Sequence, residues 1–128
     1  DTRYEPARLL IADRAKRRLV HFTLEGAFIA EVITGLRRPC AISIAPNGQV
    51  AIAELEGRVA LLDKDNQLIG VLGDQPEPGQ RANYKVPVAK WKADIFNAPH
   101  GLSWDRRGNL YVQDWNFIGR VTKWSPNN

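Results

Sequence analysis

A repeat of about 40 residues limits what this chain can fold into more than any other feature of its sequence. Pro39 and Cys40 recur sixty positions later as Pro99 and His100, an interval that includes about twenty inserted residues. Each unit contains short, apolar, β-prone runs joined by tight turns rich in Gly and Asn. A period in the forties with four strands to a unit is typical of a β-propeller blade, so we expect an all-β fold.

The units divide the single domain, residues 1–128, into three antiparallel four-stranded blades, two of them incomplete. The first blade is expected at about 7–34, the second at about 36–73 and the third at about 97–126, with an inserted loop at about 74–96. The first blade lacks its first strand, and the third lacks its fourth. Long loops on rigid scaffolds often carry binding sites, so the inserted loop is a candidate contact surface, although a variable decoration fits it equally well.

Three blades are too few to close a ring, because closed propellers have about 4 to 8. Each blade buries its faces against its neighbours, so the two outermost faces are expected to be flat, apolar and prone to association. Two copies related by a two-fold axis would give six blades, and the predicted partner is therefore a second copy of this chain, as a homodimer. A segment of a longer six-bladed chain is the alternative. The chain contains no methionine, which indicates that it is processed, excerpted or engineered.

Composition narrows the classes of partner. The 128 residues carry 18 basic and 14 acidic side chains, with a net charge of +4. Because the two signs are interspersed, nucleic acid is not the favoured partner, and a basic RNA-binding surface is kept as an alternative function. No apolar run approaches the ~20 residues that span a membrane, so a soluble chain without a membrane partner is expected. One cysteine excludes an intramolecular disulfide and leaves the compartment open, a secreted or periplasmic parent protein included.

One acid and one arginine recur at the same place in every unit, at the end of the second strand and the start of the third. The pairs are Asp13 with Arg18, Glu54 with Arg58, and Asp114 with Arg120. Because arginine and a carboxylate can form two parallel hydrogen bonds, we expect each pair to support the loop between its strands. Paired catalytic carboxylates are not expected, since the acids lie on separate blades.

Apolar and aromatic residues also recur. Phe22, Leu62 and Trp124 are repeat-equivalent, and we expect them between the blades. Three further aromatic residues lie in or beside loops, where they could face a ligand: Tyr84, Trp91 and Trp115.

These motifs resemble the NHL repeat. The Ala-Asp of residues 12–13, with Arg-Leu-Val-His-Phe and the following Glu-Gly, resembles the second half of that repeat. Pro-His-Gly-Leu-Ser-Trp-Asp at 99–105, with Gly-Asn-Leu-Tyr-Val and Asp114, resembles the first half. The resemblance covers most of the chain outside the insertion. It implies a six-bladed propeller, in agreement with the expected closure.

The Pro-His-Gly-Leu-Ser segment is most similar to the peptidyl-hydroxyglycine lyase branch of the NHL proteins. In that branch, the histidine after such a proline is one of three that bind zinc in the central channel, which implies a metal-ligand role for His100. Cys40 occupies the equivalent position one blade earlier. The branch's catalytic Tyr and Arg have no match here, so no catalytic residue is assigned.

Two chains closing a ring would place two His and two Cys around the axis, and these are ligands that suit tetrahedral zinc. The alternative is that neither residue binds a metal: His100 then hydrogen-bonds neighbouring backbone, and Cys40 is a small apolar residue in the packing. The expected function is a non-catalytic binding or scaffold module that self-assembles and holds a small ligand or peptide at its axis. A zinc-containing, lyase-like enzyme is the second hypothesis.

Overall fold

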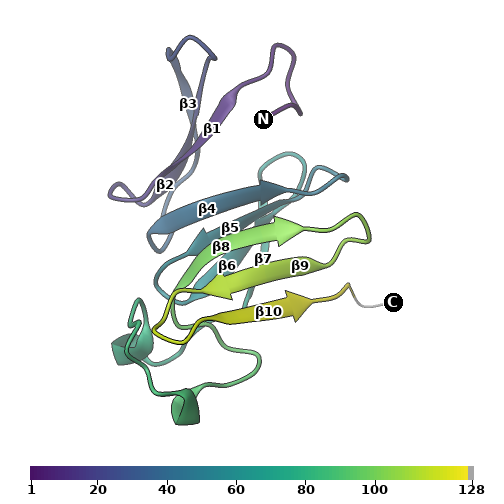
Figure 1. The fold of residues 1–128 in the computed structure, drawn as a ribbon. Helices are drawn as coiled ribbons and strands as arrows, with labels where there is room; N and C mark the ends of the chain where they lie inside the picture. The colour runs from purple at the N-terminus through teal and green to yellow at the C-terminus, as the bar shows by residue number, and fades with distance from the viewer. Residues whose placement is uncertain (127–128) are drawn as a thin grey trace.

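The protein is all-β in its described part. The computed structural model describes residues 1–126, which form ten β-strands in three antiparallel sheets, with two 3₁₀ turns and no α-helix among them (Figure 1). The sheets follow one another in chain order, and a green loop projects from one end (Figure 1). The all-β prediction is therefore confirmed. No helix within residues 1–126 has the length and apolar character needed to cross a membrane.

The first sheet has three strands in the order β1-β2-β3. These are β1 (Leu9–Asp13), β2 (Arg18–Phe22) and β3 (Phe28–Ile33). Comparison with the second sheet identifies them as the second, third and fourth strands of a blade. The position next to β1, where an inner strand would lie, is taken by no strand of the described chain.

The second sheet is a complete blade with the order β4-β5-β6-β7. Its strands are β4 (Pro39–Ile44), β5 (Val50–Glu54), β6 (Arg58–Leu62) and β7 (Leu68–Leu72). All five residues of β5 are buried, because this sheet has a neighbour on each face. That burial explains why β5 reads as a continuous apolar run rather than an alternating one.

The third sheet contains β8 (Pro99–Trp104), β9 (Leu110–Asp114) and β10 (Arg120–Trp124). Between β7 and β8 the inserted segment forms two single turns, η1 (Pro78–Gln80) and η2 (Val88–Lys90). Its return to the sheet is fixed by Phe96, which is buried and donates its N–H to the carbonyl of Gly73. The insertion is thus anchored at its base.

Two apolar cores lie between the sheets. The first joins Leu19 of the first sheet to Val50, Ile52 and Leu62 of the second. The second core joins the opposite face of the second sheet to the third, and its members include Ala51, Val59, Phe96, Leu110 and Val112. Alternate residues of β5 therefore serve different cores, as strand geometry requires.

The two outward faces of this stack differ in polarity. The leading flank, on the first sheet, is apolar over Leu9, Ile11, Phe22 and Phe28, and the ion-paired Asp13, Arg18 and Glu31 lie at its other end. The trailing flank, on the third sheet, mixes apolar and polar side chains, namely Tyr111, Gln113, Val121 and Lys123. The prediction of two apolar flanks therefore fits most of the first sheet's flank but not the third sheet's, since Gln113 and Lys123 stand where the second sheet has Ala53 and Leu61.

Candidate functional site

The recurring acids sit where the chain approaches each inner strand. The register pairs Pro39 with Glu54, and Pro99 with Asp114. The loops between second and third strands lie at this same end of the sheets. We name this end the axial face and define it by four segments: residues 14–17, 37–40, 97–100 and 115–119.

Each acid contacts the arginine that the sequence pairs with it. Arg18 Nε lies 2.9 Å from Asp13 Oδ2, and Arg120 Nε lies 3.0 Å from Asp114 Oδ2. Arg58 donates to both carboxylate oxygens of Glu54. The carboxylates of Glu54 and Asp114 are fully buried, whereas the Asp13 side chain is 27% exposed.

The buried acids also hold the backbone that leads into the inner strands. Asp114 Oδ1 accepts hydrogen bonds from the N–H groups of Asn97 and Ala98, at 3.0 and 2.8 Å. Glu54 Oε1 accepts the N–H of Arg37 in the same way. These bonds fix the segments just before Pro39 and Pro99, and thereby place the two residues that follow them at the axial face. Sequence reasoning predicted the arginine partners but missed these backbone donors.

His100 and Cys40 both lie near Arg14, which comes from the first sheet's loop. Arg14 Nη2 is 3.5 Å from His100 Nε2, and because a guanidinium only donates, this ring nitrogen acts as the acceptor. The Cys40 thiol donates to the carbonyl of Arg38 at 3.5 Å, and the Arg14 cation is near enough to affect its pKa. Burial raises the pKa of the Cys40 thiol, and the Arg14 and Arg38 cations offset only part of that rise.

These contacts define the chemical environment of His100 and Cys40 within a single chain. Within residues 1–126, no three His, Cys, Asp or Glu side chains gather where they could hold a metal ion. The thiolate is the form of cysteine that binds metals, and the raised pKa of Cys40 favours the thiol. Arg14 adds a fixed positive charge beside His100.

An aromatic cluster borders His100 on the axial face. The Trp115 ring lies 5.7 Å from the His100 ring and 5.3 Å from the Tyr84 ring, and Phe117 packs edge-on against Tyr84 at 5.2 Å. Phe117 and Ile118 are largely exposed, at 77% and 74%. Exposed apolar side chains gathered beside polar groups are typical of a contact surface.

The structure separates the three aromatic residues predicted to face a ligand. Tyr84 and Trp115 meet at the axial face, and Tyr84 brings the inserted loop there. Trp91 instead donates its indole N–H to the carbonyl of Val86 and lies under the Arg120 guanidinium, so it supports the insertion. Arg14 and Phe117 were not predicted as site residues, because nothing in their local sequence shows which distant residues they meet.

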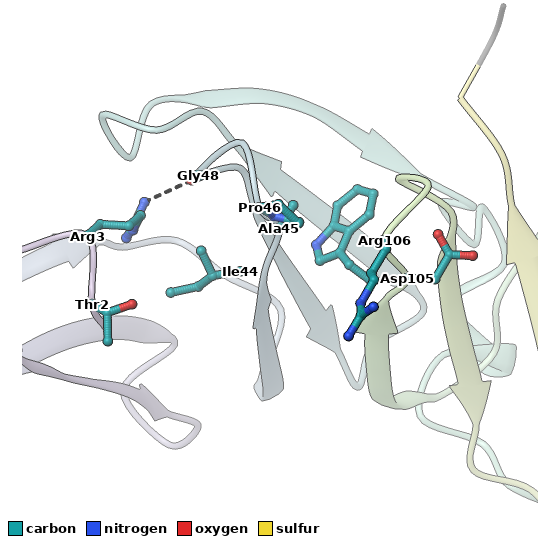
Figure 2. Close-up of a pocket in the computed structure, with 9 residues that line it drawn as sticks. Thr2, Arg3, Ile44, Ala45, Pro46, Gly48, Asp105 and Arg106 are labelled. Atoms are coloured by element: carbon teal, nitrogen blue, oxygen red, sulfur yellow. Dashed lines mark hydrogen bonds between the residues drawn. The ribbon is translucent and has the colours of Figure 1, made fainter.

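A cleft of about 490 Å³ opens at the other end of the sheets. Thr2 and Arg3 form one side and the turns at Pro46 and Arg106 another, and Arg3 donates to the Gly48 carbonyl at 3.2 Å (Figure 2). The turns that line it connect the far ends of β4 and β8 to the next strands. This cleft is therefore remote from His100 and Cys40.

Comparison with known proteins identifies the fold class. No family model and no curated protein sequence matches the chain. A solved gluconolactonase structure from Xanthomonas campestris matches with a TM-score of 0.59 and 17% identity, over 84% of this chain and 31% of that one. The chain has a β-propeller-type fold.

Two lyase structures match less well. They are virginiamycin B lyase from Staphylococcus aureus (TM-score 0.48, 15% identity, 96% of this chain and 53% of that one) and a streptogramin B lyase (0.49, 14%, 94% and 52%). The chain thus spans about a third to a half of the length of these structures. Identities this low describe the fold alone.

Proposed function

We propose that this chain is a three-blade sector of an NHL-type six-bladed propeller, divided as the repeat predicts, and that it acts as a non-catalytic binding and scaffold module. In this proposal the ring is completed by a second copy, so that the leading flank of one copy covers the trailing flank of the other. The observation that supports it is the burial of the equivalent residues in the second sheet, which has a neighbouring sheet on each face.

The repeat register indicates which residues would meet. Ile11 of the leading flank is equivalent to Ile52, and Val121 of the trailing flank is equivalent to Val59. Ile52 and Val59 are fully buried in the cores on either side of the second sheet, whereas Ile11 and Val121 are 38% and 66% exposed. Burial of exposed apolar area is the main favourable term in association, so a neighbouring blade at each flank would lower the free energy.

The axial face supports a binding role for such a ring. Arg14, His100 and Trp115 combine a cation, a hydrogen-bonding ring and an exposed aromatic surface on this face. A small ligand or peptide with an anionic group suits these side chains. Two copies would present the set twice around one axis.

A charge on the trailing flank is expected to weaken association. Val121→Lys places a second ammonium beside Lys123, and burying it against the apolar leading flank is costly. We expect the dissociation constant of the dimer to rise at least about tenfold, which corresponds to about 1.4 kcal/mol. Sedimentation velocity over a concentration series measures this constant.

Leu24→Lys is the matched control, because Leu24 is an exposed apolar residue in the β2–β3 turn, outside both flanks. It is expected to leave the dissociation constant unchanged. Circular dichroism should show folded protein for both variants, since neither side chain is buried in one copy. Equal dissociation constants for Val121→Lys and wild type would refute the proposed contact.

A zinc-containing, lyase-like ring is the second candidate, and it is favoured by one observation. His100 and Cys40 follow equivalent prolines on neighbouring inner strands and lie near the same Arg14 side chain. Titration with zinc in competition with a chromogenic chelator tests this candidate. One zinc ion is expected for every two chains.

Zinc binding should strengthen as the pH rises, because the Cys40 thiol must lose its proton. His100→Ala should abolish the binding, and His21→Gln, at the chain's other histidine, should not. Saturable binding that survives His100→Ala would exclude the axial zinc site.

A further inference from the structure

The cleft at the far end of the sheets continues between two equivalent turns. A hollow of about 370 Å³ extends the 490 Å³ cleft, and the two share Ala45, Pro46, Trp104 and Arg106. Arg106 stands across the cleft from Ala45 and Pro46 (Figure 2). These two walls are turns in the interior of the chain, the β4–β5 turn and the β8–β9 turn. Concave sites of about 300–1,000 Å³ typically hold small molecules.

The two turns share a backbone pattern but differ in their side chains. In each turn the first residue donates its N–H to the carbonyl of the fifth, at 2.8 Å in the β4–β5 turn and 2.9 Å in the β8–β9 turn. The β4–β5 turn has Pro46 and Asn47 where the β8–β9 turn has Arg106 and Arg107. Because the same turn forms without arginine, the fold does not require two cations at this place.

Both arginines are exposed, and within residues 1–126 their side chains form no ion pair. The acid of their own turn is occupied elsewhere, because Asp105 accepts the N–H of Arg107 at 2.8 Å and the side-chain amide of Asn109 at 2.7 Å. The hydrogen bond from the Asn109 side chain lowers the pKa of Asp105, so its carboxylate is ionised at neutral pH. The turn therefore carries two positive charges and one negative charge.

Trp104 adds an aromatic wall to the cleft. It is equivalent to Ile44, and both side chains pack against the cores between the sheets. The Trp104 indole N–H is buried and has no acceptor in the described part of the chain, whereas buried indole N–H groups usually have one. Since Ile44 serves the equivalent position without such a donor, core packing alone does not account for a tryptophan here.

We propose that the cleft between the β4–β5 and β8–β9 turns binds a small aromatic molecule that carries a carboxylate. Its ring would pack on Trp104 and Pro46, and its carboxylate would accept hydrogen bonds from Arg106 and Arg107. Guanidinium and carboxylate groups form charge-assisted hydrogen bonds that are frequently bidentate. Aromatic rings add offset or edge-on packing to the apolar area that they bury. The net positive charge of the turn complements the charge of such a ligand.

The probe is 1-naphthylacetate, which joins a planar bicyclic ring to a carboxylate. Calorimetric titration of the full chain should show saturable binding. Neutral 1-naphthylacetamide tests the need for the charge, and acetate tests the need for the ring. Each should bind at least about tenfold more weakly than 1-naphthylacetate, because each lacks one of the two expected contacts. The affinity for 1-naphthylacetate should also fall as the salt concentration rises.

Arg106→Pro combined with Arg107→Asn gives the β8–β9 turn the residues of the β4–β5 turn, which this fold already accommodates. The double variant should stay folded by circular dichroism and bind 1-naphthylacetate at least about tenfold more weakly. Arg106→Gln with Arg107→Gln, which leaves proline out of the turn, should weaken binding equally. Lys90→Gln with Lys92→Gln is the matched control, because it removes the same charge from exposed side chains of the insertion. It should leave the affinity unchanged.

The axial face also carries a cation, so two further measurements locate the binding. Of the four indole N–H signals in a nitrogen-15 NMR spectrum, that of Trp104 should shift on titration and that of Trp115 should not. Arg14→Gln should leave the affinity unchanged. Loss of binding in Arg14→Gln would assign the ligand to the axial face and overturn the cleft site.

Absence of saturable binding, or equal affinities for 1-naphthylacetate and its amide, would also overturn this inference. So would full affinity in the folded variant that carries the residues of the β4–β5 turn. These outcomes are independent of ring closure by two copies. A chain that stays monomeric but binds through the β8–β9 turn keeps the cleft site and refutes the dimer.

Discussion

Replacing Asp114 with alanine is expected to lower the free energy of unfolding by about 3–5 kcal/mol, the range for breaking a buried ion pair by removing one partner. Asp114 is fully buried and satisfies Arg120 and the N–H groups of Asn97 and Ala98. Arg120 also donates to the carbonyls of Lys92 and Ile95. The substitution therefore leaves buried donors without an acceptor and loosens the base of the insertion.

Asp13→Ala is the matched control for this experiment. It removes the acid at the same repeat position. The Asp13 carboxylate is partly exposed, and within residues 1–126 it accepts no hydrogen bond from a segment that leads into an inner strand. Urea unfolding followed by circular dichroism should give a much smaller loss for Asp13→Ala than for Asp114→Ala. Similar losses of unfolding free energy would show that the backbone hydrogen bonds accepted by Asp114 do not determine how much it contributes to stability.

Gly73→Ala is expected to lower the free energy of unfolding by about 2–4 kcal/mol, combining overpacking with a left-handed backbone conformation. Gly73 has φ +60°, and a Cβ there would lie 2.6 Å from Phe96 Cε2. Phe96 is held in place by its hydrogen bond to Gly73 and by the core between the second and third sheets, so it has little room to move.

Gly26→Ala separates the two causes. Gly26 has φ +93°, and nothing lies within 4 Å of the position that its Cβ would take. Only the backbone term applies there, so the expected loss is about 1–2 kcal/mol. Differential scanning calorimetry should show the larger fall in melting temperature for Gly73→Ala. Equal falls in melting temperature would mean that the Phe96 ring moves aside at no cost in free energy.

The strands could be predicted from the sequence because each is bounded by a turn and repeated elsewhere. Tight turns rich in Gly and Asn predicted short strands on either side, and β4 and β5 flank the turn at Asn47 and Gly48. Repeat equivalence also predicted that Leu62 and Trp124 lie between sheets, which they do. Phe22 holds the same repeat position but lies on the leading flank, where no preceding blade covers it.

The axial face could be predicted only in part. His100 and Cys40 follow equivalent prolines, so repeat logic placed them at one end of the fold. The contact of Arg14 with His100 joins residues 86 positions apart and depends on the path of a turn, which no local pattern encodes. The repeat also gives no sign that His21 is buried beside Tyr4 and Asp1, because this burial depends on the N-terminal segment that packs against it.

The most direct test of ring closure is the mass of the unmodified chain by sedimentation equilibrium, across micromolar concentrations and two salt conditions. If two copies cover each other's flanks, the mass at the upper concentrations is twice the 14.4 kDa of one chain. It should fall towards one chain on dilution, because association obeys mass action. A single species of 14.4 kDa at every concentration would contradict closure by self-association.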